Sequence, residues 1–148
     1  MGLIRDIGDG PLALDTACFI YFIEEHPRFL PALDPVFEAI DAGRLQAVTS
    51  SLSLLEVLVV PYRAGNLALA ERYEEVLARS RGLRLIGIDR AQFRAAAQLR
   101  ARYAGLRTPD AIQLSAALAG SCSALLTNDR DLPALAGLRI LQLEDYPK

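Results

Sequence analysis

Four acidic residues lie where the sequence around them is largely apolar: Asp15, Glu56, Asp110 and Asp129. A parallel α/β arrangement would bring strand ends and helix starts to one edge of the sheet, and with them these four side chains. Carboxylates that lie so close together repel one another, and a divalent cation is the usual way in which a protein tolerates the cluster. With Mg²⁺ or Mn²⁺, such a site activates water and stabilises charge on a phosphodiester.

The scarcity of other reactive residues narrows the chemistry. The chain of 148 residues has one histidine, His26, and its single lysine is the last residue, Lys148. A Schiff-base lysine, a Walker A lysine and a zinc cluster of His and Cys are therefore excluded within the fold. The two cysteines, Cys18 and Cys122, show no metal-type spacing and are expected to be buried thiols in a reducing cytoplasm.

The first two acids interrupt apolar segments. Asp15 follows the strand-like Leu12–Leu14 directly, and the alternative to a ligand role is an N-cap for the next helix. Glu56 interrupts a helical segment, 50–60, that is apolar nearly all round, which predicts a buried helix. A buried carboxylate needs a partner, so Glu56 is expected to contact a cation or a set of hydrogen-bond donors, or else a single arginine.

The other two acids lie at the ends of predicted elements. Asp110 follows Thr108, the expected N-cap of an apolar helix, and the alternative is that it only stabilises the helix dipole. Asp129 comes just after a predicted strand, where an Asx turn is the alternative, and Asp131 is a second candidate for the fourth acid.

Short apolar runs alternate with longer segments of helical period along the whole chain. This pattern predicts an α/β sandwich with a central, mostly parallel five-stranded sheet flanked by helices. The expected strands are 11–15, 45–49, 83–88, 124–127 and 138–143. The expected helices are 16–25, 34–42, 50–60, 66–80 and 89–103, one that begins at Thr108, and a short one at 131–136. Pro61 is expected to end the third helix.

Residues 11–148 are expected to form a single domain that follows an N-terminal arm, residues 1–10. No apolar run reaches the roughly 20 residues that span a bilayer, which favours a cytoplasmic protein without a membrane partner.

The charge is unevenly distributed. The segment 79–107 contains eight arginines and one acid, Asp89, although the whole chain has a net charge of −2. A local basic face of this kind can contact phosphates, and the alternative is a solvated helix whose arginines pair with neighbouring acids.

Taken in order, four short segments resemble those of PIN-domain ribonucleases, and more narrowly of the VapC type of toxin from bacterial toxin–antitoxin pairs. Leu14-Asp15-Thr16 is similar to the opening strand, and Ser53-Leu54-Leu55-Glu56-Val57-Leu58 to the helix with the buried glutamate. The third and fourth acids stand in the similar segments Leu106-Arg107-Thr108-Pro109-Asp110-Ala111-Ile112-Gln113 and Leu126-Thr127-Asn128-Asp129-Arg130-Asp131-Leu132.

The resemblance implies a three-layer sandwich that hydrolyses RNA with Mg²⁺ or Mn²⁺ as cofactor. Asp15, Asp110 and Asp129 would hold the metal, and Glu56 would complete the pocket and help to orient water. Hydrogen-bond donors that hold the carboxylates in place would be Thr16, Thr127 and Asn128, and Arg107 would contact the RNA backbone. The implied partners are a small antitoxin and a second copy of the chain in a homodimer.

Two other functions are compatible with the same residues. One is a PIN nuclease that processes RNA without an antitoxin, and the other is a non-catalytic PIN-like module that binds a metal or a protein.

Overall fold

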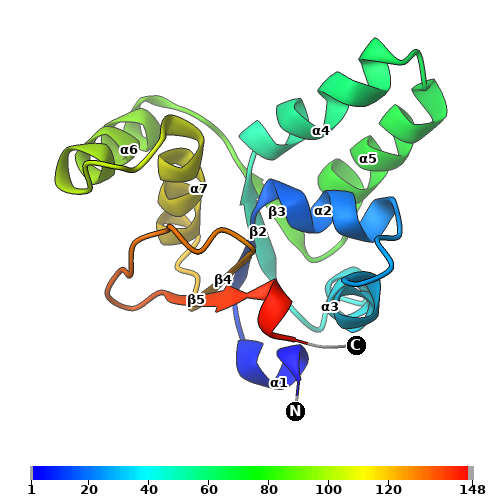
Figure 1. Ribbon diagram of the computed structural model, residues 1–148, viewed down its shortest axis with the longest axis horizontal. Helices are drawn as coiled ribbons and strands as arrows, with labels where there is room; N and C mark the ends of the chain where they lie inside the picture. Colours follow the sequence, from blue (N-terminus) through cyan, green and yellow to red (C-terminus); the bar gives the residue numbers. More distant parts are fainter. Residues whose placement is uncertain (1, 147–148) are drawn as a thin grey trace.

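The computed structural model describes residues 2–146, which form seven α-helices and one sheet of five strands (Figure 1). The helices are α1 (Leu3–Ile7), α2 (Thr16–Ile23), α3 (Leu30–Asp41), α4 (Leu52–Arg63), α5 (Leu67–Arg79), α6 (Arg90–Arg102) and α7 (Thr108–Ala119). The strands are β1 (Leu12–Leu14), β2 (Ala47–Ser50), β3 (Leu83–Ile86), β4 (Ala124–Thr127) and β5 (Arg139–Gln142), followed by a 3₁₀ turn, η1 (Leu143–Asp145).

The strand order is β3-β2-β1-β4-β5, and all four neighbouring pairs are parallel. The predicted α/β sandwich with a parallel sheet is therefore confirmed. The chain leaves β1 toward β2 and β3 and later crosses to β4 and β5 on the other side, so the order reverses between β1 and β4. In open α/β sheets, ligands bind outside the carboxyl ends of the strands at such a switch point.

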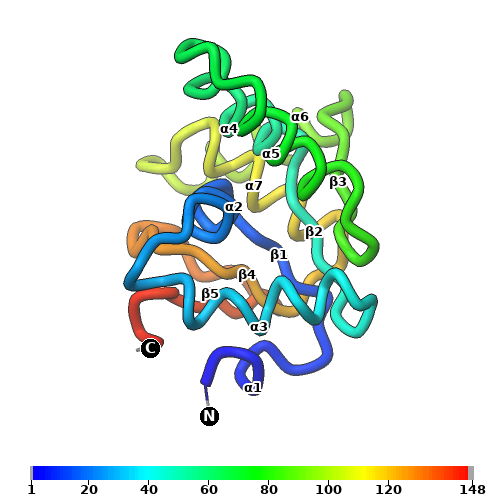
Figure 2. Tube along the Cα trace, turned by 90° about the vertical axis from the view of Figure 1, so that its right-hand side faces the viewer, coloured from blue at the N-terminus to red at the C-terminus, as the bar shows by residue number. Residues whose placement is uncertain are grey.

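Side chains that alternate along the strands divide the core between the two faces of the sheet. Leu12 and Leu14 pack with α1, α2, α3 and α5 on one face, whereas Ala13 packs with α6 and α7 on the other. Figure 2, viewed from the side of α3, shows α2, α3 and α5 in front of the sheet and α6 and α7 behind it. Strands buried on both faces in this way explain the continuous apolar runs of the sequence.

The predicted starts of the helices at Asn66 and Asp89 are confirmed to within one residue. Asn66 and Asp89 accept hydrogen bonds from the backbone N–H groups of Leu69 and Gln92, at 3.1 and 2.9 Å, and so cap α5 and α6. Strand β4 has the predicted bounds, and both cysteines are free and buried.

Three predictions about helix ends and turns are wrong. Helix α4 continues through Pro61 to Arg63, so only the one backbone hydrogen bond that Pro61 cannot donate is lost. Thr108 is the first residue of α7 and not its cap, and its hydroxyl accepts from Arg100 Nη1 at 2.9 Å. Residues 131–136 form no helix; a bridge between Leu135 and Leu138 takes that place.

The predicted burial of α4 is also wrong. Only Ser53, Val57 and Pro61 of this helix are buried, because α4 packs on α5 and α2 while the pair α4–α5 projects beyond the sheet (Figure 1). The opposite surface, here called the α4 apolar face, is solvent-exposed. It consists of Leu55, Val59 and Tyr62, spaced by four and three residues on one side of the helix, which are 61, 40 and 55% exposed.

The segment before β1 is part of the packed structure. Leu3 and Ile7 of α1 are buried in the core, and Arg139 of β5 donates to the carbonyl oxygens of Asp6 and Ile7 at 2.6 and 3.0 Å. Across residues 2–146, no helix has both the length and the apolar character needed to cross a membrane.

Gly82, just before β3, tests how closely the sheet packs on α3. A Cβ at this position would lie 2.5 Å from the carbonyl oxygen of Ile40 and 2.7 Å from that of Leu45, and neither backbone can move freely. We expect Gly82→Ala to lower the free energy of unfolding by about 3 kcal/mol, at the upper end of typical overpacking costs. Urea denaturation followed by circular dichroism measures this change.

Gly105→Ala is the matched control, because a Cβ there meets no atom within 4 Å. Its effect should be about 1 kcal/mol or less. Equal effects of the two substitutions would show that the backbone around Gly82 yields easily.

Candidate active site

Asp15 lies directly after β1 and joins three elements at the switch point. Its Oδ1 accepts a hydrogen bond from the backbone N–H of Cys18 at 3.4 Å, so that it caps α2, and its Oδ2 accepts from the hydroxyl of Thr127 at the end of β4. Burial raises the pKa of this carboxyl, although the hydrogen bonds from Thr127 and Cys18 oppose the change. Asp15 is therefore both the N-cap of α2 and a side chain of the site.

Glu56 contacts Asp15's neighbour in the chain. The hydroxyl of Thr16 donates to Glu56 Oε1 at 2.6 Å, and Thr16 also lies 3.0 Å from the hydroxyl of Ser53, one turn before Glu56 on α4. Among residues 2–146, Glu56 forms no ion pair with an arginine. The start of α4 is thus held to the end of β1 through hydroxyl groups.

Asp110 lies in the first turn of α7, with its Oδ2 3.5 Å from Nε of Arg107. Burial raises the pKa of Asp110, and the negative charges of Asp129 and Glu56 raise it further, while Arg107 opposes them. The side chains of Asp110, Asp129 and Glu56 therefore interact electrostatically, although they come from α7, the loop after β4, and α4.

Asp129 is fixed by the loop that follows β4. Its backbone N–H donates to the hydroxyl of Thr127 at 3.0 Å, and its Oδ1 accepts from the N–H of Asp131 at 2.9 Å, which is the Asx turn considered as the alternative. Asp131 is exposed, and it meets Asp129 through its backbone N–H. Asp129 is the acid of this loop that interacts with Asp110.

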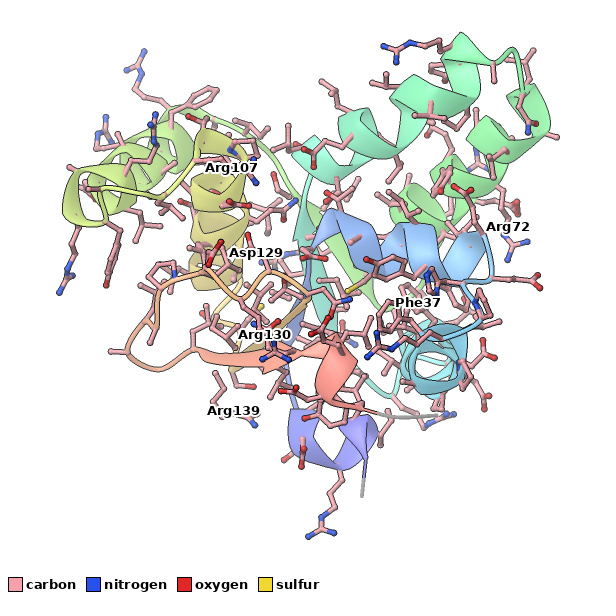
Figure 3. All side chains as sticks on the ribbon, viewed as in Figure 1. Phe37, Arg72, Arg107, Asp129, Arg130 and Arg139 are labelled. Atoms are coloured by element: carbon pink, nitrogen blue, oxygen red, sulfur yellow. The ribbon has the colours of Figure 1, made fainter. Side chains whose placement is uncertain are left out.

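The remaining predicted donors differ in what they contact. Thr16 and Thr127 donate to Glu56 and Asp15. Asn128 points elsewhere, since its Oδ1 accepts from the backbone N–H of Glu144 at 2.9 Å and holds the loop against η1. Figure 3 shows Arg107 at the start of α7 and Asp129 on the loop after β4.

The sequence patterns did not identify two polar residues of the site, Thr49 and Gln113. Both are buried and share hydrogen bonds with Ser53 and with each other. The available signal was a glutamine inside Ala111–Ala117, a stretch of α7 that is buried throughout. A buried amide must find partners, so it marks a polar network.

The donor chemistry of the site fits a hard divalent cation, because every candidate ligand is a carboxylate oxygen. The mutual repulsion that raises the pKa of Asp110 is the force that such a cation would offset. Within the described residues, however, no three Asp, Glu, His or Cys side chains stand close enough together to hold a metal ion. Ligation by Asp15, Asp110 and Asp129 together would therefore require side-chain movement.

The basic segment remains largely unpaired with acids. Of its eight arginines, Arg79 pairs with Glu71 at 3.0 Å and Arg107 with Asp110, and no other forms an ion pair within residues 2–146. Arg90, Arg94 and Arg102 are exposed on α6. The alternative of an arginine helix neutralised by neighbouring acids therefore does not hold for α6.

The raised pKa of Asp110 leads to a prediction about stability and pH. Because the folded-state pKa lies above the unfolded one, the ionised carboxylate destabilises the folded chain once the pH exceeds both values. In metal-free protein, we expect Asp110→Asn to be more stable than the parent at pH 7, and this difference to shrink as the pH falls to about 4. Urea denaturation at both pH values measures it, and a less stable Asn variant at pH 7 would contradict the prediction.

The whole fold resembles solved structures of toxin–antitoxin complexes. A chain of the VapBC2 complex from Rickettsia felis, bound to a DNA fragment from their promoter, superposes with a TM-score of 0.66 at 17% identity, covering 88% of this chain and 97% of that chain. A chain of a toxin–antitoxin complex from Klebsiella pneumoniae gives 0.63 at 22% identity, with 86% and 94% covered. DNA-bound VapBC from Salmonella typhimurium gives 0.64 at 22% identity, with 89% and 97% covered.

Sequence comparison gives the family. No curated protein matches the sequence significantly. The model of the PIN domain matches residues 12–138, which extend from the start of β1 to the residue before β5 and include all four acids. This match covers most of the chain, and the parallel sheet with its acids at the switch point agrees with it. The chain therefore belongs to the PIN domain family.

Proposed function

We propose that this chain is a metal-dependent endoribonuclease and the toxin component of a toxin–antitoxin pair. The observation that carries the proposal is the electrostatic interaction of Asp110, Asp129 and Glu56 at the switch point of the sheet, where the Thr127 hydroxyl links Asp129 to Asp15. Carboxylates that destabilise one another are typical of functional sites, where perturbed pKa values of this kind cluster.

Each side chain has a role in this proposal. Asp15, Asp110 and Asp129 would hold Mg²⁺ or Mn²⁺, and the bound cation would supply activated water and charge stabilisation on the phosphodiester. Glu56, held by Thr16 at 2.6 Å, accepts a proton or a hydrogen bond from water in the site. Thr127 keeps Asp15 oriented, and the exposed Arg107 is available for a backbone phosphate of RNA.

The α4 apolar face supports a protein partner. Exposed apolar patches on a folded chain mark interaction sites, and this one lies on the same helix as Glu56. The three solved structures described above are toxin–antitoxin complexes. We therefore include an antitoxin and a second copy of the chain among the proposed partners.

Metal binding tests the site without knowledge of the RNA sequence. We expect calorimetric titration with Mn²⁺ to detect binding to the parent, and Asp15→Asn, Asp110→Asn and Asp129→Asn to weaken it by at least about 100-fold, because each removes a proposed ligand. Circular dichroism checks that each variant keeps the fold. Undiminished binding in all three variants would place the metal elsewhere.

Asp131→Asn is the matched control for the fourth acid. It lies two residues from Asp129, is exposed, and loses the same charge on substitution. We expect it to bind Mn²⁺ and to cleave an RNA pool like the parent, whereas Asp129→Asn does neither. The opposite outcome would make Asp131 the fourth acid.

Expression in bacteria separates the toxin from the other functions. Expression of the chain should arrest growth, Asp15→Asn should relieve the arrest, and so should coexpression of a small protein encoded directly upstream. Cleavage of RNA without such an antitoxin would favour a PIN nuclease of RNA processing. Mn²⁺ binding without any RNA cleavage would favour the non-catalytic module.

A further inference from the structure

Gln113 takes the place of a strand-to-strand hydrogen bond beside the site. The ladder between β1 and β2 ends at the pair Ala13 and Val48. Beyond it, the N–H of Ser50 donates to Gln113 Oε1 at 3.3 Å, and the carbonyl of Leu14 accepts from the hydroxyl of Thr49 at 2.7 Å. The side chain of Gln113, only 8% exposed, thus enters from α7 between two strands that have stopped pairing.

These contacts fix which way the amide of Gln113 faces. A backbone N–H only donates, so the atom that faces Ser50 must be the oxygen. The NH₂ group therefore faces the site, where it donates to the hydroxyl of Ser53 at 2.8 Å and lies 3.4 Å from that of Thr16. The amide orientation follows from this hydrogen-bonding pattern.

The hydroxyl protons can then be assigned in turn. Thr49 donates its single proton to the carbonyl of Leu14 at 2.7 Å, which is much closer than its other acceptor, Gln113 Oε1 at 3.4 Å. Thr16 donates its proton to the carboxylate of Glu56. Ser53 can then donate its proton to the hydroxyl oxygen of Thr49, 2.9 Å away, or to that of Thr16, 3.0 Å away. The NH₂ group of Gln113 differs from the hydroxyl groups of this network, because it donates two hydrogen bonds and accepts none.

We propose that Gln113 is a positioning residue of the site: its amide occupies the acceptor sites of Ser53 and Thr16, so that the proton of Thr16 points to Glu56. Through this network α7, which carries Asp110 one turn before Gln113, is linked to the helix that carries Glu56. The proposal concerns how Glu56 is held, and its catalytic consequence rests on the proposed ribonuclease function.

The first test needs neither RNA nor metal. The side-chain carboxyl carbon of Glu56 has an NMR resonance that reports its hydrogen bonds at fixed pH. We expect Gln113→Met, which keeps the length but removes all four hydrogen-bonding capacities, to shift this resonance in the same direction as Thr16→Val. Ser115→Ala is the matched control and should leave the resonance unchanged, since within residues 2–146 this buried hydroxyl on α7 bonds only the carbonyl of Ala111, at 2.8 Å.

The second test uses cleavage of an RNA pool. Gln113→Met should lower kcat by about 10- to 100-fold, the usual cost of removing a group that orients a functional side chain. In the Thr16→Val background the same substitution should have little further effect, because both act through Glu56. A merely structural role would instead make the two losses multiply.

Gln113→Glu keeps the test valid if the Met variant does not fold. Its carboxyl group has the same size but at most one proton where the amide has two, so it cannot supply both Ser53 and Thr16. A Glu56 resonance equal to that of the parent in the folded Gln113 variant, but shifted in Thr16→Val, would overturn the proposal. If the Glu56 resonance shifts in the Gln113 variant and the parent cleaves no RNA, the result would support the network and refute the nuclease function.

Discussion

The hydrogen bond from the Thr127 hydroxyl to the carboxylate of Asp15 is the contact on which the site depends. It ties the carboxyl ends of β1 and β4 together at the point where the strand order reverses. The same hydroxyl accepts from the backbone N–H of Asp129, so one threonine, fully buried at the end of β4, sets the positions of two acids. Because the strand holds Thr127 rigidly, these acids are placed more firmly than residues on a free loop would be.

This arrangement is costly to the fold. Burial raises the pKa of Asp15 and of Asp110, and the charges of Asp129 and Glu56 raise that of Asp110 further, so both carboxylates are less favourable in the folded chain than in water. The two apolar cores on either side of the sheet provide the compensating stability. Functional sites typically lower the stability of the fold in this way, because their side chains are arranged for activity and not for stability.

Helix α4 serves two surfaces at once. Toward the sheet, Ser53 and Glu56 join the hydroxyl network and Val57 packs into the core. On the other side, the α4 apolar face meets solvent, with Leu55 61% exposed. The apolar sequence of α4 therefore reflects both packing within the chain and a surface suited to a protein partner, which is why its burial cannot be judged from composition.

The sequence alone determined what depends on short-range physics. Asn66 and Asp89 satisfy helix N–H groups only three residues away, and the apolar run 124–127 marks β4 with its observed bounds. It also predicted acids at the carboxyl edge of the sheet, where Asp15 follows β1 and Asp129 follows β4, because parallel strands end at one edge. Only the tertiary structure decided the rest. Glu56 is held by Thr16, 40 residues distant, and Gln113 binds a strand 63 residues away. Such partners become neighbours only when the sheet forms, so no local pattern encodes them.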